Sequence, residues 1–235
     1  MVEDDFGIET LAAYLHVDPA QVLRLAERDK LPGRKVSGQW RFSRAEVHHW
    51  LETRIGVSND EELVQMEGVL RRAAVEPDEE AISIAAMLPI EAIAVPLPAR
   101  TRGSVITSMV EVAARTGWLW DVPKMAEAVR AREDMLPTAL EFGVALMHPR
   151  RPLAGILGQA FVAFGRTEGG IPFGAPHGGL TDLFFLILSV EDRGHLQVLA
   201  RLSRLISDSQ LLEALREAPN AAAALAAISE RESRF

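Results

Sequence analysis

The chain has 235 residues, of which 48% are hydrophobic and 25% are charged, and it contains no cysteine. This composition is typical of a globular protein, and the lack of cysteine excludes disulfides, thiolate catalysis and cysteine-ligated zinc or iron–sulfur centres. A formal net charge of −8 argues against a histone-like polyanion binder. The chain starts acidic, and its apolar run Leu183 to Leu188 is too short to cross a bilayer, so we expect a cytoplasmic protein with no membrane insertion.

The first 56 residues predict a compact helical unit. Apolar residues from Ile8 to Leu15 indicate a short helix. Asp18 and Pro19 then supply an N-cap and a proline at the first helical position of a second helix, which runs to about Asp29. The inner face of that helix is expected to consist of Val22, Leu25 and Ala26.

A tight hairpin follows the second helix. Two short strand-like segments, residues 34–36 and 39–42, flank a Ser-Gly turn. Ser43 and Glu46 then form a Ser-x-x-Glu capping box, which predicts a further helix. That helix places three apolar residues on one side, Val47, Trp50 and Leu51.

From residue 57 the pattern changes. Residues 57–80 predict a partly helical linker that ends in an acidic stretch, and residues 81–235 alternate between strand and helix patterns. The expected strands are Ala92–Leu97, Gly143–Met147, Ala160–Phe164 and Asp182–Leu188. The expected helices are Ser104–Arg115, Val122–Glu133, His195–Ile206, Gln210–Glu217 and Ala221–Glu230, with Asp208 and Asn220 as caps. This alternation predicts an α/β fold with a mixed sheet flanked by helices.

The N-terminal unit has a local excess of positive charge. Residues 24–44 hold seven basic side chains and two acidic ones, a local charge of +5 in an acidic protein. Gln21, Arg24 and Arg28 follow i, i+3, i+7 spacing and share one face of the second helix. A short helix, a turn and a polar basic helix form a helix-turn-helix layout, in which the second helix reads base edges in the major groove. The hairpin adds a wing for the DNA backbone with Arg34, Lys35 and Arg41.

Residues 6–54 resemble the excisionase-type, MerR-like winged helix domain. The matching segments are Thr10–Val17, Leu31–Val36, Gln39–Ser43 and the Trp50-Leu51 pair. The resemblance implies double-stranded DNA as a partner. The alternative is a solvated basic surface on a domain that binds protein. We expect the two tryptophans of this unit, Trp40 and Trp50, to pack in the core rather than to stack on bases.

A histidine at the end of an apolar strand is the main candidate for chemistry. His148 follows the apolar run 143–147 and precedes Pro149, Arg150 and Arg151. Neutral imidazole is a competent nucleophile, and arginine supplies paired donors to phosphate oxygens. The pattern therefore suits phosphoryl transfer, which needs positioning and charge neutralisation. No histidine pair stands at metal-ligand spacing, so metal catalysis is not expected.

Residues 84–232 resemble the enzyme IIA domain of the mannitol/fructose class of the bacterial sugar phosphotransferase system, which includes nitrogen-regulatory relatives. The resemblance rests on the joint spacing of Arg132-Glu133, Thr138, Met147-His148-Pro149-Arg150 and Gly194-His195-Leu196. It implies an enzyme IIA-like sandwich with no metal or organic cofactor, because phosphate is the cargo. The family usually has proline directly before the acceptor histidine, where this chain has Met147. His177 stands where the family often has aspartate, either at the rim of the site or simply in a loop.

The resemblance implies roles for five residues. His148 would accept a phosphoryl group from a histidine phosphocarrier protein. Arg132 would neutralise the phosphohistidine, and His195 would hydrogen-bond the phosphoryl group or the imidazole. Thr138 and Arg150 would lie at the rim of the site.

The two resemblances together predict a DNA-binding regulator controlled by phosphorylation of His148. It would have a winged helix domain at 1–56, a linker at 57–80 and an enzyme IIA-like domain at 81–235. Phosphorylation adds about 1.5–2 negative charges, which would shift a dimer or interdomain contact. A single small basic domain binds DNA weakly, so we expect a homodimer that reads two half-sites. Two alternatives stay open, a phosphocarrier for a sugar permease and a non-phosphorylated scaffold that binds a partner protein.

Overall fold

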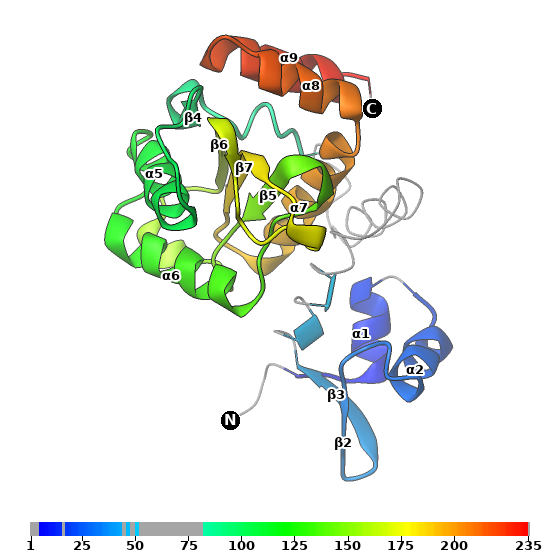
Figure 1. Ribbon diagram of the computed structural model, residues 1–235. Coiled ribbons are helices and arrows are strands. Elements are labelled where there is room, and N and C mark those ends of the chain that lie inside the picture. Colours follow the sequence, from blue (N-terminus) through cyan, green and yellow to red (C-terminus); the bar gives the residue numbers. More distant parts are fainter. Residues whose placement is uncertain (1–4, 16, 44–45, 48–49, 52–81, 235) are drawn as a thin grey trace. The chain divides into compact units, whose positions relative to one another are not determined.

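The computed structural model describes residues 5–15, 17–43, 46–47, 50–51 and 82–234. The chain divides into two compact units, residues 1–81 and residues 82–235, and each is described by itself (Figure 1). The named elements of the N-terminal unit are β1 (Asp5–Phe6), α1 (Ile8–Leu15), α2 (Pro19–Glu27), β2 (Arg34–Val36) and β3 (Gln39–Ser43).

The two predicted N-terminal helices are confirmed. α1 covers the predicted residues, and α2 begins after Asp18, whose side chain accepts a hydrogen bond of 2.7 Å from the Ala20 N–H. Of the three residues expected on its inner face, Val22 and Ala26 are buried and Leu25 is half-buried. The Asp-Pro pair therefore fixes where α2 starts, and the apolar spacing decides which face turns inward.

The predicted hairpin is also confirmed. β2 and β3 pair in antiparallel fashion with Val36 opposite Gln39. The two residues between them, Ser37 and Gly38, both have positive φ angles of 52° and 79°. This backbone geometry is the one that joins twisted strands through a two-residue turn.

β1 is an element that the sequence pattern does not reveal. It pairs with the far side of β3, with Phe6 opposite Phe42, and gives the three-stranded order β1-β3-β2. Two residues are too few to show strand alternation, so only the pairing defines this strand. The predicted capping box at 43–46 and the predicted linker at 57–80 involve residues outside the described ranges.

The C-terminal unit is a mixed sheet with helices on both faces. Its elements are η1 (Ile90–Ala92), β4 (Ile93–Ala94), α5 (Arg102–Ala114), α6 (Val122–Met135), η2 (Glu141–Gly143), β5 (Val144–Met147), η3 (Ala154–Ile156), β6 (Phe161–Ile171), η4 (Pro176–Gly178), β7 (Thr181–Leu188), α7 (Asp192–Ile206), α8 (Ser209–Glu217) and α9 (Ala221–Glu232), where η marks a 3-10 turn. The strand order is β4-β6-β7-β5. β6 and β7 are antiparallel, whereas β4 runs parallel to β6 and β5 runs parallel to β7. The mixed α/β fold expected from the sequence is therefore confirmed.

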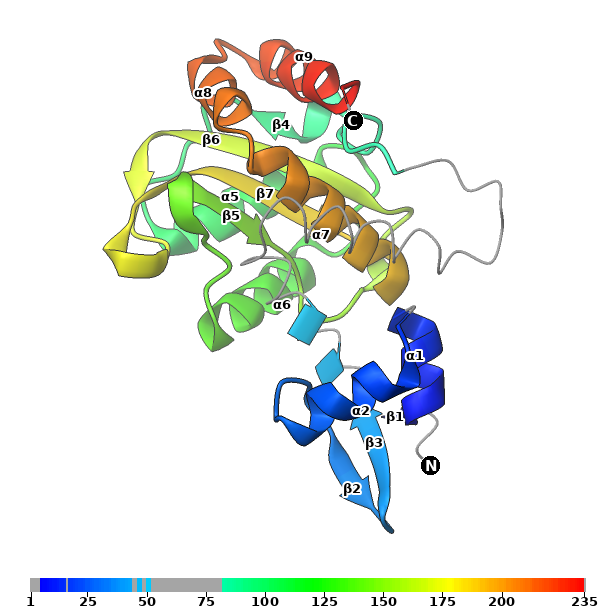
Figure 2. The ribbon, with the colours of Figure 1, turned by 90° about the vertical axis from the view of Figure 1, so that its right-hand side faces the viewer.

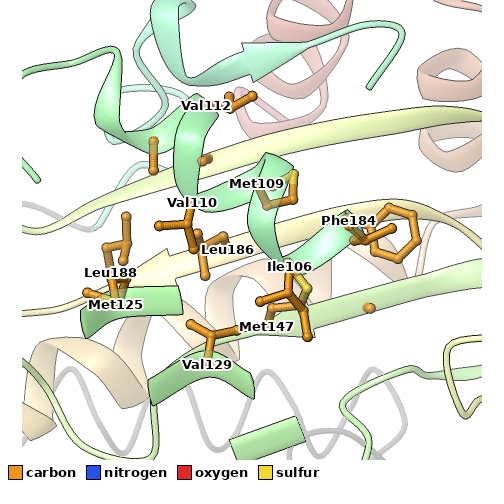
Figure 3. Close-up of a cluster of buried hydrophobic side chains, with 14 of the residues drawn as sticks. Ile106, Met109, Val110, Val112, Met125, Val129, Met147, Phe184, Leu186 and Leu188 are labelled. Carbon is orange, nitrogen blue, oxygen red and sulfur yellow. The ribbon is translucent and has the colours of Figure 1, made fainter. Parts of the chain in front are cut away.

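The sheet is covered by α5 and α6 on one face and by α7 on the other (Figures 1 and 2). Alternate residues of β7, Phe184, Leu186 and Leu188, join the core beneath α5 and α6. Figure 3 shows this core, in which Met109 of α5 and Met147 of β5 are also labelled. Strand residues alternate between faces, so Phe185 and Ile187 point toward the opposite side of the sheet, where they are also buried. Burial on both faces explains the uninterrupted apolar run in this strand.

Two predicted strands have the wrong length. The segment predicted as Ala92–Leu97 contributes only Ile93–Ala94, because Ala92 ends a 3-10 turn and Pro96 has no N–H to donate to the sheet. The strand predicted as Ala160–Phe164 continues to Ile171, through glycines that are typical of loops. Gly165 is required there, since a Cβ at this position would lie 2.5 Å from the Met109 sulfur.

The predicted C-terminal caps are confirmed. Asp208 accepts from the Gln210 N–H at 2.8 Å, and Asn220 accepts from the Ala223 N–H at 3.0 Å.

Within the described part of the chain, no helix combines the length and the apolar character needed to cross a membrane.

Candidate functional site

His148 lies at the carboxyl end of a buried strand. It directly follows Met147, the last residue of β5, and only 2% of its surface is exposed. Its Nδ1 lies 2.9 Å from the carbonyl oxygen of Leu146. A carbonyl oxygen can only accept a hydrogen bond, so this contact requires the proton on Nδ1. In the neutral ring the lone pair is then on Nε2.

His195 is the immediate neighbour of His148. It lies in the first turn of α7, 6% of its surface is exposed, and its Nδ1 is 3.3 Å from the Ser189 hydroxyl oxygen. The centroids of the two imidazole rings are 4.8 Å apart, with 57° between the ring planes. The structure therefore brings together the two histidines that the sequence analysis singled out.

The topology explains why these two side chains meet. β5 and β7 are parallel neighbours, with Met147 opposite Leu186. The residues that follow the two strands, His148 after β5 and Ser189 after β7, emerge at the same edge of the sheet. α7 starts from that edge and runs along one face of the sheet (Figure 2). The carboxyl ends of parallel strands are where open α/β sheets bind their ligands.

Arg132 is a buried cation near the start of the segment that leads into β5. It lies in the last turn of α6, 5% of its surface is exposed, and its Nη1 donates to the Leu136 carbonyl at 2.7 Å. A few residues later, the Thr138 carbonyl accepts from the Leu146 N–H at 3.3 Å. These contacts connect Arg132 to the strand whose end carries His148.

Thr138 has a partner that the sequence analysis did not assign. Its side chain is buried, and its hydroxyl and its N–H both donate to the carboxylate of Glu133, the N–H at 3.1 Å. The hydroxyl expected at the rim of the site is thus engaged by a carboxylate. Burial raises the pKa of Glu133, and the contacts from Thr138 together with the charges of Arg132 and Arg102 counteract this shift only in part.

Glu133 and Arg102 are the residues that sequence reasoning missed. Glu133 is fully buried, and the Nη2 of Arg102 lies 3.9 Å from its carboxylate. Arg102 begins α5, also approaches Asp134 at 3.4 Å, and lies over the ring of Phe173 at 5.8 Å. The adjacency of Glu133 to Arg132 was the available signal, but its burial depends on distant segments.

Two further polar residues considered at the rim lie on the surface. Arg150 is exposed in the turn that follows His148 and Pro149. His177 is exposed within η4 and has a positive φ of 56°. The structure leaves both side chains at solvent-facing positions.

Most of the basic residues predicted on the N-terminal unit are at the surface. Gln21, Arg24, Arg28, Arg34 and Lys35 are exposed, and Arg41 is half-buried. Arg24 of α2 and Arg28, which caps that helix, form no ion pair with the described part of the chain. By contrast, Arg34 is paired with Asp5 at 2.8 Å. The positive charge of the hairpin is therefore partly neutralised, whereas no carboxylate among the described residues pairs with Arg24 or Arg28.

The two tryptophans of this unit are half-buried. Trp40 stacks on Phe42 with ring centroids 6.0 Å apart, and the Lys35 ammonium lies 5.2 Å from its ring centroid. Trp50 donates its Nε1–H to the Lys30 carbonyl at 2.6 Å. Both rings make contacts within the unit, but neither is fully buried as the core position expected from the sequence requires.

Within the residues that the structure describes, no group of three or more histidine, aspartate or glutamate side chains is placed to hold a metal ion. His148 offers a ring nitrogen that can act as a nucleophile, and Arg132 is a buried cation; side chains of these two kinds suit an anionic group such as phosphate.

Comparison with known protein families matches both units. Residues 86–231 match the family described as phosphoenolpyruvate-dependent sugar phosphotransferase system, EIIA 2. Residues 6–55 match a helix-turn-helix domain. The two matches fall on the two parts of the chain where the sequence analysis found its resemblances.

Individual relatives agree with this result. A nitrogen regulatory protein of Bradyrhizobium diazoefficiens is 34% identical over 131 residues, which cover 54% of this chain and 84% of the relative. A fructose-specific EIIA component of Haloferax volcanii is 30% identical over 137 residues, covering 57% of this chain and 87% of that protein. The crystal structure of the nitrogen regulatory protein IIA-Ntr of Neisseria meningitidis superposes with a TM-score of 0.56 at 28% identity, covering 62% of this chain and 98% of that one.

Proposed function

The chain belongs to the EIIA 2 family of the phosphoenolpyruvate-dependent sugar phosphotransferase system, and on that premise we propose that it accepts a phosphoryl group on His148 and binds DNA through its helix-turn-helix domain under the control of that phosphorylation. The observation that carries this proposal is the buried His148–His195 pair at the carboxyl ends of β5 and β7. The proposed donor is a histidine phosphocarrier protein.

In the proposed transfer, His148, His195 and Arg132 have different roles. Nε2 of His148 attacks the phosphorus, the N–P bond of the donor phosphohistidine breaks as the Nε2–P bond forms, and the donor imidazole leaves with its electron pair. The proton stays on Nδ1, which donates to the Leu146 carbonyl throughout, and this keeps the attacking lone pair on Nε2. His195 is close enough to donate to the transferred group, and Arg132 supplies positive charge.

The test is phosphoryl acceptance by the full chain. The protein is incubated with phosphoenolpyruvate, enzyme I and a histidine phosphocarrier, and its intact mass is read under non-acidic conditions. A gain of one phosphate is expected. No gain, while a control acceptor is phosphorylated in the same mixture, would overturn the phosphoacceptor role and favour the scaffold alternative.

The regulatory part needs a separate measurement. DNA binding of the phosphorylated and unphosphorylated chain is compared at fixed salt, on a site selected from random duplexes. We expect the two affinities to differ, because the phosphoryl group adds about 1.5–2 negative charges at a buried site. Equal affinities would remove the control by phosphorylation and leave DNA binding as an independent activity.

Replacing Arg132 by lysine distinguishes the contribution of its charge from that of its planar guanidinium group. We expect phosphoryl acceptance by Arg132→Lys to slow by about tenfold, since lysine keeps the charge but lacks the planar fork of donors. One arginine can donate to the Leu136 carbonyl and still present a second N–H to phosphate. Single-turnover transfer from the phosphorylated carrier measures the rate. Arg130→Lys, on the exposed side of α6, is the matched control.

The DNA-reading role of α2 can be tested at Arg24. We expect Arg24→Ala to weaken binding about tenfold and to relax the sequence preference, because a paired contact to a base contributes about 1–3 kcal/mol of discrimination. Arg34→Ala is the matched control, since its guanidinium is already paired with Asp5 and should contribute less. Titrations at fixed salt measure both. Unchanged affinity and preference in Arg24→Ala would exclude it from the reading face.

A further inference from the structure

A fully buried carboxylate connects three segments next to the candidate site. Glu133 of α6 accepts the N–H and the hydroxyl of Thr138, and it lies 3.9 Å from the guanidinium of Arg102 at the start of α5. A buried polar group of this kind is favourable only where its partners are held in place. Glu133 therefore fixes Thr138 in one position relative to α6.

The position of Thr138 is passed on to His148 through the backbone. The Thr138 carbonyl accepts from the Leu146 N–H at 3.3 Å, and the next residues continue the contact, with Ala139 bridged to Ala145. The Leu146 carbonyl in turn faces Nδ1 of His148 at 2.9 Å. An unbroken series of contacts thus runs from the Glu133 carboxylate through Thr138 and Leu146 to the imidazole.

We propose that Glu133 is a positioning residue for His148, acting through Thr138 and Leu146 to hold the Nδ1–H form of the ring and the direction of Nε2. The inference rests on the proposed function, since it concerns how the acceptor is prepared. It gives Thr138 a positioning role as well, in place of a contact with the phosphoryl group.

The energetics favour this role over simple packing. Because burial raises the pKa of Glu133, the folded state holds a proton more tightly than the unfolded state. Stability therefore falls as the pH rises from the ordinary value for glutamate through the raised one. An apolar side chain of similar size would avoid this cost. It would, however, leave the N–H and hydroxyl of Thr138 without the acceptor that locates them.

The experiment compares Glu133→Gln with Glu133→Leu in the full chain. Glutamine keeps an oxygen for the Thr138 N–H and an amide that can donate to its hydroxyl, whereas leucine has neither. Imidazole ¹⁵N shifts of unphosphorylated His148 report which ring nitrogen carries the proton. Phosphoramidate then reports nucleophilicity without any protein donor. In that reaction the Nε2–P bond forms, the P–N bond of phosphoramidate breaks, and ammonia leaves.

The two variants should differ clearly in their His148 ¹⁵N shifts and in their rates with phosphoramidate. We expect Glu133→Leu to lose the preference for Nδ1–H and to react about tenfold more slowly, the usual order for loss of a supporting hydrogen-bond shell. Glu133→Gln should keep the wild-type shifts and stay within about threefold of its rate. A change in stability alone would not move the ¹⁵N shifts of a folded protein, so they distinguish positioning from packing.

Two outcomes would overturn the inference. One is Glu133→Leu with unchanged His148 shifts and rate, and the other is Glu133→Gln with the same losses as Glu133→Leu. If Glu133→Leu does not fold, Thr138→Val carries the test, since it removes only the hydroxyl. A smaller shift of the same sign is then expected, and no shift counts against the inference. Wild-type protein that neither phosphoramidate nor the phosphorylated carrier can modify would refute the proposed function, while the shifts would still decide the positioning role.

Discussion

Replacing His148 by alanine is expected to abolish phosphoryl acceptance. The change removes the ring whose Nε2 lone pair is set by the Nδ1 contact with the Leu146 carbonyl. His195 does not substitute for it, because its own Nδ1 faces the Ser189 hydroxyl and it lies on a different element. Intact mass after incubation with phosphoenolpyruvate, enzyme I and a histidine phosphocarrier measures the result. The wild type should gain one phosphate and His148→Ala none.

A control at a second histidine makes this result specific. His177 is exposed in η4 and has a positive φ, a conformation that asparagine tolerates well. His177→Asn should therefore fold normally and gain phosphate at the wild-type rate. Phosphate retained by His148→Ala would place the acceptor elsewhere, with His195 the first residue to examine. Loss of phosphate in His177→Asn would instead assign the glycine-rich loop to the site.

The local parts of the fold could be predicted from the sequence. The Asp18-Pro19 pair fixes the start of α2, and Asn220 fixes the start of α9, because a cap acts on the N–H groups two or three residues away. The hairpin was predictable for the same reason, since its turn is set by Ser37 and Gly38 themselves. Signals of this kind lie within a few residues of the structure that they determine.

The elements that the sequence pattern did not predict depend on partners that are distant in the sequence. β1 exists because residues 5–6 pair with β3, and β6 extends through a glycine-rich stretch because β7 pairs with it as far as Ile171. Gly165 in that stretch indicates a loop by composition, yet the structure needs it for the close approach of Met109. Strand pairing and packing of this kind cannot be recognised from the local sequence, because distant residues determine them.

In the candidate site, too, local motifs indicate some residues, and tertiary contacts alone reveal others. That His148 and His195 lie side by side could be expected, because the spacing of their motifs resembles that of a known family, and parallel β5 and β7 bring the two residues to one edge of the sheet. Glu133 could not be assigned, although it adjoins Arg132, because its partners come from α5 and from the segment before β5. A buried carboxylate and an exposed one look identical in sequence, and only the tertiary contacts separate them.

Replacing Glu232 by alanine is expected to destabilise the C-terminal unit by about 3 kcal/mol, the usual cost of breaking a buried charged network. Glu232 ends α9 and is buried. It accepts from the N–H groups of Ile84 and Ala85 at 2.8 Å and 3.0 Å, from the Ser83 hydroxyl at 2.8 Å, and from Arg201 of α7 at 3.0 Å. The carboxylate thus joins the last helix to the first described turn of the unit and to α7.

The matched control lies two residues away on the same helix. Glu230 is exposed, and among the described residues its side chain pairs with Arg234 one turn later, so Glu230→Ala should change the stability by less than about 0.5 kcal/mol. Urea unfolding of the full chain, followed by amide exchange in the β6 and β7 peptides, reports the C-terminal unit. Equal stabilities of the two variants would show that the Glu232 network contributes nothing beyond an exposed pair.

The effect of Glu232 should also depend on pH in a defined direction. Burial alone would raise the pKa of this carboxyl, but the hydrogen bonds from Ala85, Ile84, Ser83 and Arg201 outweigh it and lower the pKa. A lowered folded-state pKa contributes stability that is fully present above the ordinary value for glutamate and is lost as the pH falls through the lowered one. The gap between wild type and Glu232→Ala should therefore narrow on acidification below about pH 4.5. A gap that stays constant down to pH 3 would mean that the ionised carboxylate is not what holds α9 and α7 to the start of the unit.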